Sequence, residues 1–66
     1  MEIFVNGEAC EVQDACSVEQ LLKKMDILRH RLAVEVNEEI VPKSRHAEFV
    51  FSSGDKVEIV HAIGGG

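Results

Sequence analysis

The sequence predicts an α+β fold in which a mixed sheet of four to five strands packs on one helix. Three observations lead to this prediction. Strand-like runs open and close the body of the chain, at residues 1–5 and 56–62. The turn signal Asn6-Gly7 directly follows the first run. Between the two runs, the segment after Ser17 has the spacing of an amphipathic helix.

The first element is a β-hairpin. Apolar residues take alternate positions from Met1 to Val5, which is the period of a strand. Asn6-Gly7 favours a type I′ turn, because this turn needs positive φ at both central residues. Residues 8–12 then return as an antiparallel strand, on which Cys10 and Val12 share a face.

The second element is a helix that begins after Ser17. Ser17 is a good N-cap, and Gln20 three residues later completes a capping box. Cys16, just before the cap, is placed to form a hydrophobic staple with Leu21. We expect the helix to end near Asp26 or Ile27. One apolar stripe recurs at helical spacing and is expected to pack on the sheet: Val18, Leu21, Leu22 and Met25.

The remaining segments complete the sheet. Residues 32–36 alternate with the period of a strand, and residues 40–42 are extended because the position before proline avoids the helical region. A single helical turn is expected from Pro42 to Ala47. Residues 49–51 predict a short strand and residues 56–62 the last one.

The order of these elements limits how they pack. An isolated hairpin is marginally stable, so the helix must cover one face of the sheet. We expect the last strand to lie beside the first, central and parallel to it, because one helix then shields both apolar strands. This arrangement is the β-grasp, or ubiquitin-like, roll. It is expected to span residues 1–61, with a flexible C-terminal glycine tail at residues 62–66.

Size and charge exclude several classes of function. A domain of 66 residues has little room for a deep catalytic pocket, since so short a chain buries only about 60% of its unfolded surface. The net charge is 7 − 12 = −5, which argues against nucleic acid and favours a basic protein partner.

No stretch reaches the roughly 20 apolar residues of a membrane span. No signal peptide is visible, so we expect a cytoplasmic protein with no membrane partner.

The side chains offer no catalytic or metal-binding constellation. Cys10 and Cys16 have neither CxxC nor zinc-finger spacing, and we expect them to be reduced thiols. His30, His46 and His61 are scattered, and none pairs with a cysteine at ligand spacing. Phosphate-loop, GxSxG and HExxH motifs are also missing. We therefore expect no metal site and no enzyme active site.

The three C-terminal glycines, Gly64, Gly65 and Gly66, are the feature that the fold does not explain. Glycines add nothing to a core and lose more freedom on ordering than any other residue. They make a thin arm whose reactive group is the terminal carboxylate of Gly66. Residues 62–66 reach about 16–18 Å when extended, which suits a terminus that must enter the active site of another protein.

The sheet face opposite the helix is a candidate docking surface. Strand parity places Phe4, Val60 and Ala62 on this face, and Phe4 and Val60 are expected to be neighbours. A docking patch here would continue into Ile63 of the tail. The alternative is a set of ordinary surface hydrophobes that loops partly cover. The carboxylates expected near the apolar residues are Glu2, Glu35 and Glu58.

Several short motifs follow one another in a set order along the chain. They are Val5-Asn6-Gly7-Glu8, Ser17-Val18-Glu19-Gln20-Leu21-Leu22, Val36-Asn37, Ile40-Val41-Pro42, the run from Gly54 to Val60, and Ile63-Gly64-Gly65-Gly66. Together they resemble the ThiS family of sulfur carrier proteins in thiamine (thiazole) biosynthesis, over essentially the whole length. That family usually ends in Gly-Gly, whereas this chain has one further glycine.

The resemblance implies a mechanism. An E1-like adenylating enzyme of the ThiF type would use ATP and magnesium to adenylate Gly66, while the carrier itself binds no cofactor. Sulfur from a cysteine desulfurase or another donor would convert the adenylate to a thiocarboxylate. Thiazole synthase of the ThiG type would then receive the sulfur. Gly66 is the residue expected to be modified, Gly64 and Gly65 would be recognised as tail, and docking would use Phe4, Glu58, Val60, Ala62 and Ile63.

Alternative functions stay open at this point. The chain could carry sulfur for molybdopterin or another sulfur-containing metabolite. It could instead be a ubiquitin-like modifier that forms isopeptide bonds with lysines, or a plain interaction domain. The fate of the activated terminus separates the thiamine carrier, the other sulfur carriers and the ubiquitin-like modifier, because all of them begin with the same activation chemistry.

Overall fold

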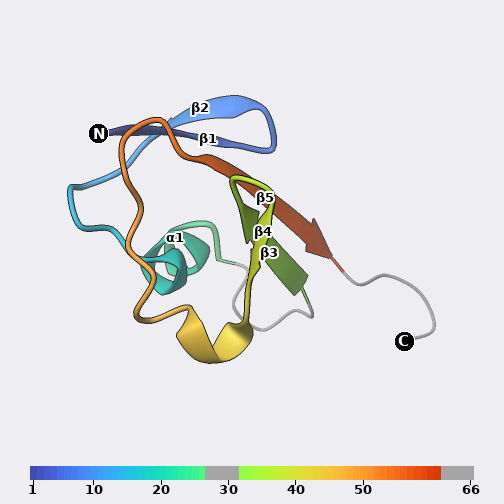
Figure 1. The fold of residues 1–66 in the computed structure, drawn as a ribbon. Coiled ribbons are helices and arrows are strands. Elements are labelled where there is room, and N and C mark those ends of the chain that lie inside the picture. The colour runs from blue at the N-terminus through green and yellow to red at the C-terminus, as the bar shows by residue number, and fades with distance from the viewer. Residues whose placement is uncertain (27–31, 62–66) are drawn as a thin grey trace.

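The chain forms one sheet that packs on one helix in a computed structural model, which describes residues 1–26 and 32–61 (Figure 1). The elements are β1 (Glu2–Val5), β2 (Glu8–Glu11), α1 (Val18–Lys24), β3 (Leu32–Val36), β4 (Glu39–Val41), the 3₁₀ turn η1 (Lys43–Arg45) and β5 (Lys56–His61).

The five strands have the order β2-β1-β5-β3-β4, so β5 is central. It runs parallel to β1, with Phe4 beside Lys56 and Val5 beside Val57. It runs antiparallel to β3 over five residue pairs, from Val36 with Val57 back to Leu32 with His61. This mixed sheet confirms the predicted β-grasp fold, including the parallel pairing of the first and last strands.

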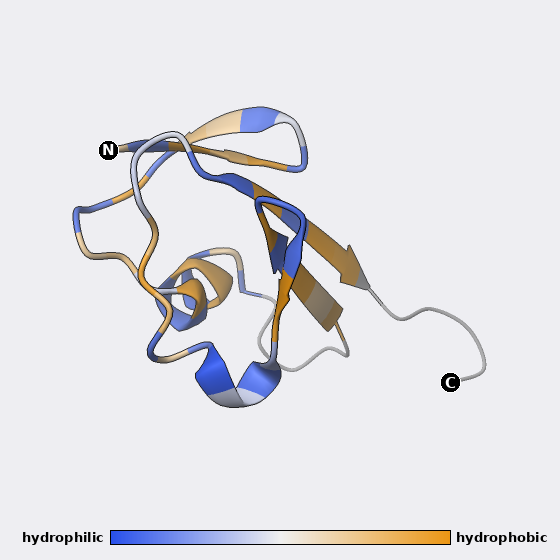
Figure 2. Cartoon of the chain, in the orientation of Figure 1, coloured by the Kyte–Doolittle hydropathy of each residue, from blue (hydrophilic) through white to orange (hydrophobic). Residues whose placement is uncertain are grey.

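The core lies between the sheet and α1. Figure 2 shows hydrophobic residues on β3 and β5 and on the side of α1 that faces the sheet. Burying each such side chain contributes about 1.5–3 kcal/mol. The largest fully buried side chains are Ile3, Leu21, Leu22, Val18, Val34 and Val57.

Local signals set both ends of the helix. The Ser17 Oγ accepts a hydrogen bond from the Gln20 main-chain N–H (3.1 Å), and the Gln20 Oε1 accepts one from the Ser17 N–H (2.9 Å), which confirms the capping box. The apolar stripe is shorter than predicted. The helix ends at Lys24, and Met25, at its C-cap, leaves 41% of its surface exposed. Met25 cannot continue the buried stripe because the chain turns away there, at Asp26 with φ 60°.

Two predicted elements differ from the structure. Residues 49–51 do not form a strand: Val50 makes a single antiparallel bridge to Ser17. The segment is instead anchored by packing, because Phe51 is only 3% exposed and meets Phe49 edge to face, with ring centroids 6.0 Å apart. The helical turn after Pro42 is a three-residue 3₁₀ turn, and it ends before Ala47.

Both turn residues of the first hairpin have positive φ, 50° at Asn6 and 86° at Gly7, as the type I′ prediction requires. The φ of Gly7 lies in the region that L side chains rarely adopt. The turn therefore sets the register in which Val5 faces Glu8 across the hairpin.

Candidate functional site

Strand β5 leads the chain to its C-terminal segment. Its backbone pairs with β3 as far as Leu32 with His61, which is the last residue that the structure describes. The tail residues Ala62, Ile63 and Gly64 to Gly66 lie outside the described residues. The predicted boundary between residues 61 and 62 and the predicted roles of the glycines therefore stay predictions.

The open face of the sheet is formed by residues that alternate with the core positions. Val60 on β5 lies beside Ala33 on β3, and Glu58 lies beside Glu35, which in turn lies beside Ile40 on β4. Val60 is 58% exposed and Ile40 is 67% exposed. Val60 and Ala33 therefore form an apolar row near the end of β5, and Ile40 lies in the neighbouring row, beside the Glu35–Glu58 pair.

The register corrects the predicted patch. Phe4 and Val60 are not neighbours, because Phe4 lies beside Lys56. Val60 lies four positions after Lys56, a distance of about 13 Å along a strand. Phe4 is also half-buried rather than exposed. Glu2 lies further away still, at the start of β1, where its carbonyl accepts a hydrogen bond from Gly54.

Sequence reasoning missed Ile40 as a member of the open face. A signal was present, because Val41 and Ile40 alternate and only one of them can point to the core. Val41 is buried and Ile40 points away. That assignment depends on the pairing of Glu35 with Ile40, which the β3–β4 hairpin sets.

The same face carries a cross-strand pair of carboxylates. Glu35 and Glu58 lie directly opposite each other on β3 and β5, and like charges in such a position destabilise a sheet. A shallow hollow beside them contains three carboxylates and one ammonium group. Its lining residues are Glu35, Asn37, Glu38, Lys56 and Glu58. This surface is suited to a cationic partner group more than to an anion.

The thiols and His46 have structural surroundings. Cys16 is buried, and this burial raises the pKa of its thiol, which lowers the fraction of reactive thiolate. Cys10 is half-buried at the edge of the core. His46 is buried, with its Nε2 3.1 Å from the Val41 carbonyl oxygen, so it ties η1 to β4. His30 lies outside the described residues.

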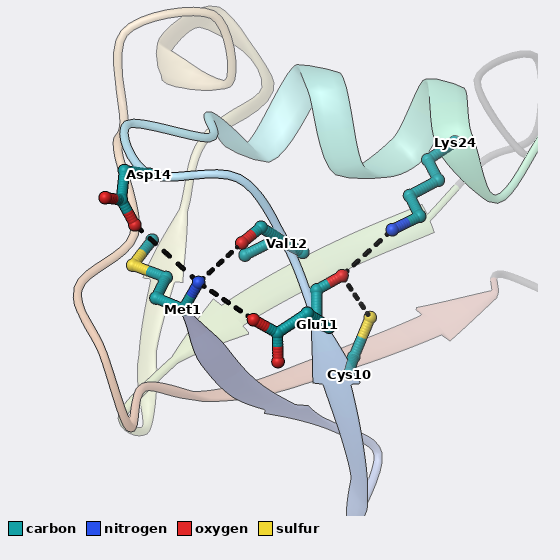
Figure 3. Close-up of polar contacts among 6 residues, drawn as sticks. All are labelled: Met1, Cys10, Glu11, Val12, Asp14 and Lys24. Carbon is teal, nitrogen blue, oxygen red and sulfur yellow. Dashed lines mark hydrogen bonds and ion pairs between the residues drawn. The ribbon is translucent and has the colours of Figure 1, made fainter.

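A second polar cluster holds the amino end of β1 (Figure 3). The Met1 ammonium donates to the Val12 carbonyl at 2.7 Å and lies 3.2 Å from Glu11 Oε2 and 3.6 Å from Asp14 Oδ1. Its pKa is raised, first by the hydrogen bond to the Glu11 carboxylate and further by the charges of Glu11 and Asp14. Because β1 and β5 are parallel, this cluster and the end of β5 lie at opposite ends of the sheet (Figure 1).

The described part of the chain contains no group of three or more His, Cys, Asp or Glu side chains that could hold a metal ion. Among the same residues, no helix has the length and apolar character needed to span a membrane.

Comparison with known proteins identifies the family. The ThiS family model matches residues 3–66. The chain belongs to the ThiS family. It is 29% identical over 66 residues to the sulfur carrier protein ThiS of Escherichia coli, and the match covers 100% of both chains. A crystal structure of the thiamine biosynthesis protein ThiS from Geobacter metallireducens superposes with a TM-score of 0.82 at 29% identity, over 100% of both chains.

A further relative is much longer than this ThiS chain. The thiazole synthase of Paramagnetospirillum magneticum is 44% identical over 66 residues, which cover 100% of this chain but only 20% of that protein. The chain thus spans about a fifth of the length of that relative. The family prediction made from the ordered motifs is confirmed.

Proposed function

We propose that this ThiS chain is the sulfur carrier for the thiazole of thiamine, and that the chemistry takes place on the Gly66 carboxylate. One observation carries the proposal: the family match extends from residue 3 to residue 66, and so includes the terminal glycines. The full-length match to a sulfur carrier protein supports it further.

Activation must come first, because a carboxylate is a poor electrophile. A Gly66 carboxylate oxygen attacks the α-phosphorus of ATP, the bond to the β-phosphate breaks, and pyrophosphate leaves. Magnesium bound with the ATP offsets the phosphate charge. The product is an acyl adenylate, a mixed anhydride from which AMP departs readily.

Sulfur transfer follows in two steps. A persulfide sulfur, supplied by a cysteine desulfurase, attacks the acyl carbon and displaces AMP to give an acyl disulfide. A second thiol then attacks the donor's cysteine sulfur, forms a disulfide with it, and releases the thiocarboxylate as the S–S bond breaks. The thiocarboxylate sulfur is the nucleophile that thiazole synthase consumes, and the Gly66 carboxylate is regenerated.

In this scheme the chain is not itself an enzyme. An E1-like adenylating enzyme, a sulfur donor and thiazole synthase supply the catalysis, and the carrier supplies a reachable terminus. The thiazole synthase relative supports this choice of acceptor, because one fifth of its chain aligns with this carrier. A carrier and its acceptor joined in one chain meet at high effective concentration.

The open face is the proposed docking surface for the adenylating enzyme. Val60 and Ala33 offer an apolar row, and the neighbouring row offers the negative charge of the Glu35–Glu58 pair together with the exposed Ile40. An apolar centre with a charged border is typical of a protein–protein interface. The predicted docking residues Glu58 and Val60 belong to this surface, whereas Phe4 is half-buried and lies beside Lys56, at its border. Roles for Ala62 and Ile63 rest on their position in the tail.

The test is the intact mass of the chain. We expect incubation with the adenylating enzyme, ATP, magnesium and a sulfide source to exchange one oxygen of the chain for sulfur. A variant without Gly65 and Gly66 serves as the control and should keep its original mass. An unchanged mass for the full chain refutes the carrier function. Lysine-linked conjugates in cells, with no thiocarboxylate, would instead identify a ubiquitin-like modifier.

The pathway needs a separate readout, because other sulfur carriers share this chemistry. We expect the chain to restore thiazole formation when it is combined with purified thiazole synthase and the adenylating enzyme. Sulfur transfer to a molybdopterin precursor in place of thiazole formation would reassign the carrier to that pathway.

A further inference from the structure

Two asparagines hold strand β5 from opposite flanks. Asn6 follows β1 and Asn37 follows β3, so each lies in the turn after a strand that borders β5. Both have left-handed backbone conformations, with φ of 50° and 53°, which asparagine tolerates better than most residues. The sequence repeats the same pattern at both places, Val-Asn-Gly-Glu at 5–8 and Val-Asn-Glu-Glu at 36–39.

Asn6 extends the β1–β5 ladder after the backbone of β1 has turned away. Its main-chain N–H donates to the Val57 carbonyl at 2.8 Å. Its side-chain Oδ1 accepts from the Ile59 N–H at 2.8 Å, and its Nδ2 donates to the Ile59 carbonyl at 3.3 Å. The last backbone pair between β1 and β5 is Val5 with Val57. Beyond this pair, the side-chain amide of Asn6 takes the place of a β1 peptide group and pairs with Ile59.

Asn37 makes matching contacts at the other end of the strand. Its main-chain N–H donates to the Lys56 carbonyl at 2.7 Å, and its Oδ1 accepts from the Lys56 N–H at 3.0 Å. Its Nδ2 donates to the Asp55 Oδ1 at 3.0 Å. These side-chain bonds are exposed, whereas those of Asn6 are partly buried. Water competes less with the Asn6 bonds.

We propose that Asn6 is a positioning residue for the reaction at Gly66, which rests on the proposed function above. It fastens the β1 flank of β5 at Ile59, 66 − 59 = 7 residues before the terminus. Seven residues span at most about 25 Å, so the arm must start from a fixed place to bring its end to a bound ATP. Without the Asn6 bonds, β5 beyond Val57 is held by β3 alone, so the start of the arm is less fixed and more of its freedom must be lost in the partner.

Glycine substitution gives a matched pair of variants. Asn6→Gly and Asn37→Gly each remove one side-chain amide, and glycine accepts the left-handed conformation of both turns. Both variants are measured at a temperature where circular dichroism shows them folded. The assays are amide hydrogen exchange of the chain alone and ATP–pyrophosphate exchange with the adenylating enzyme, at varied carrier concentration.

In Asn6→Gly, we expect faster exchange at the Ile59 amide. The kcat for adenylation should fall about tenfold, as for the loss of one or two partly buried hydrogen bonds. KM should change little, because the docking face is intact. In Asn37→Gly, the Lys56 amide should exchange faster while kcat and KM stay at the wild-type values. A general loss of stability would not separate the two variants in this way.

Three results would overturn the inference. Wild-type kcat in Asn6→Gly, or an equal loss of kcat in both variants, would show that Asn6 does not position the tail. Unchanged Ile59 exchange in Asn6→Gly would show that the amide does not hold the strand, and this measurement needs no enzyme. A wild-type chain that supports no pyrophosphate exchange counts against the proposed function instead.

Discussion

The facing carboxylates of Glu35 and Glu58 give a prediction in which stability and function change in opposite directions. They lie directly opposite each other on the neighbouring strands β3 and β5, on the open face. Directly opposed side chains have Cβ atoms roughly 4.5–5.5 Å apart. Two unit charges at about 5 Å in water repel by about 0.8 kcal/mol, which is similar in size to the roughly 0.2–1 kcal/mol that a favourable cross-strand pair contributes.

The perturbation is Glu35→Gln, which keeps the shape of the side chain and removes one charge. We expect the free energy of unfolding in urea to rise by about 0.5 kcal/mol at low salt. This gain should shrink in 1 M salt, where the Debye length is only about 3 Å. The KM of the carrier in ATP–pyrophosphate exchange should rise at the same time, because a basic partner then meets one carboxylate of the pair instead of two.

The control is Glu8→Gln, which removes a charge from edge strand β2, where Glu8 faces Val5 rather than another carboxylate. We expect it to change neither the stability nor KM by a comparable amount. A lower stability in Glu35→Gln would show that the carboxylates do not repel each other. A gain in stability with unchanged KM would remove the pair from the docking surface.

Three further predictions follow from the core, the open face and the amino end. Leu21→Ala should lower the free energy of unfolding by about 2–5 kcal/mol, because Leu21 is fully buried; a loss below about 1 kcal/mol would contradict this packing. Val60→Asp should raise KM in pyrophosphate exchange and leave the melting temperature nearly unchanged, since Val60 is largely exposed; a large drop in melting temperature would place it in the core. The pKa of the Met1 ammonium is raised above 8.0 in the folded chain, so its stabilising effect is complete below that pH and is lost as pH rises through the folded value. Urea melts from pH 7 upward should show this decline, and Glu11→Gln should weaken it.

Local signals in the sequence were sufficient for several elements. Asn6-Gly7 predicted the hairpin turn, and the Ser17–Gln20 pair predicted the start of the helix. Alternation predicted β3 with the bounds that the structure has, residues 32–36. Each of these features depends on residues that are close in the chain, so their chemistry can be read without the rest of the fold.

Contacts between distant segments were harder to predict. The neighbour of Phe4 is Lys56 rather than Val60, because the register of two strands far apart in sequence is set by how the whole core packs. Residues 49–51 have the composition of a strand, yet the segment packs Phe51 into the core and makes one bridge to Ser17. Ile40 reached the open face only through the pairing of β4 with β3.

The sequence by itself determined the fold class, the family and the terminal glycines on which the proposed chemistry depends. These follow from patterns that are local or simply ordered along the chain. The tertiary structure decided which residues share the open face and which side chains hold β5. The hydrogen bonds from Asn6 to Ile59 join residues 53 positions apart. Such bonds form only when the strands assemble around β5, so no local sequence pattern predicts them.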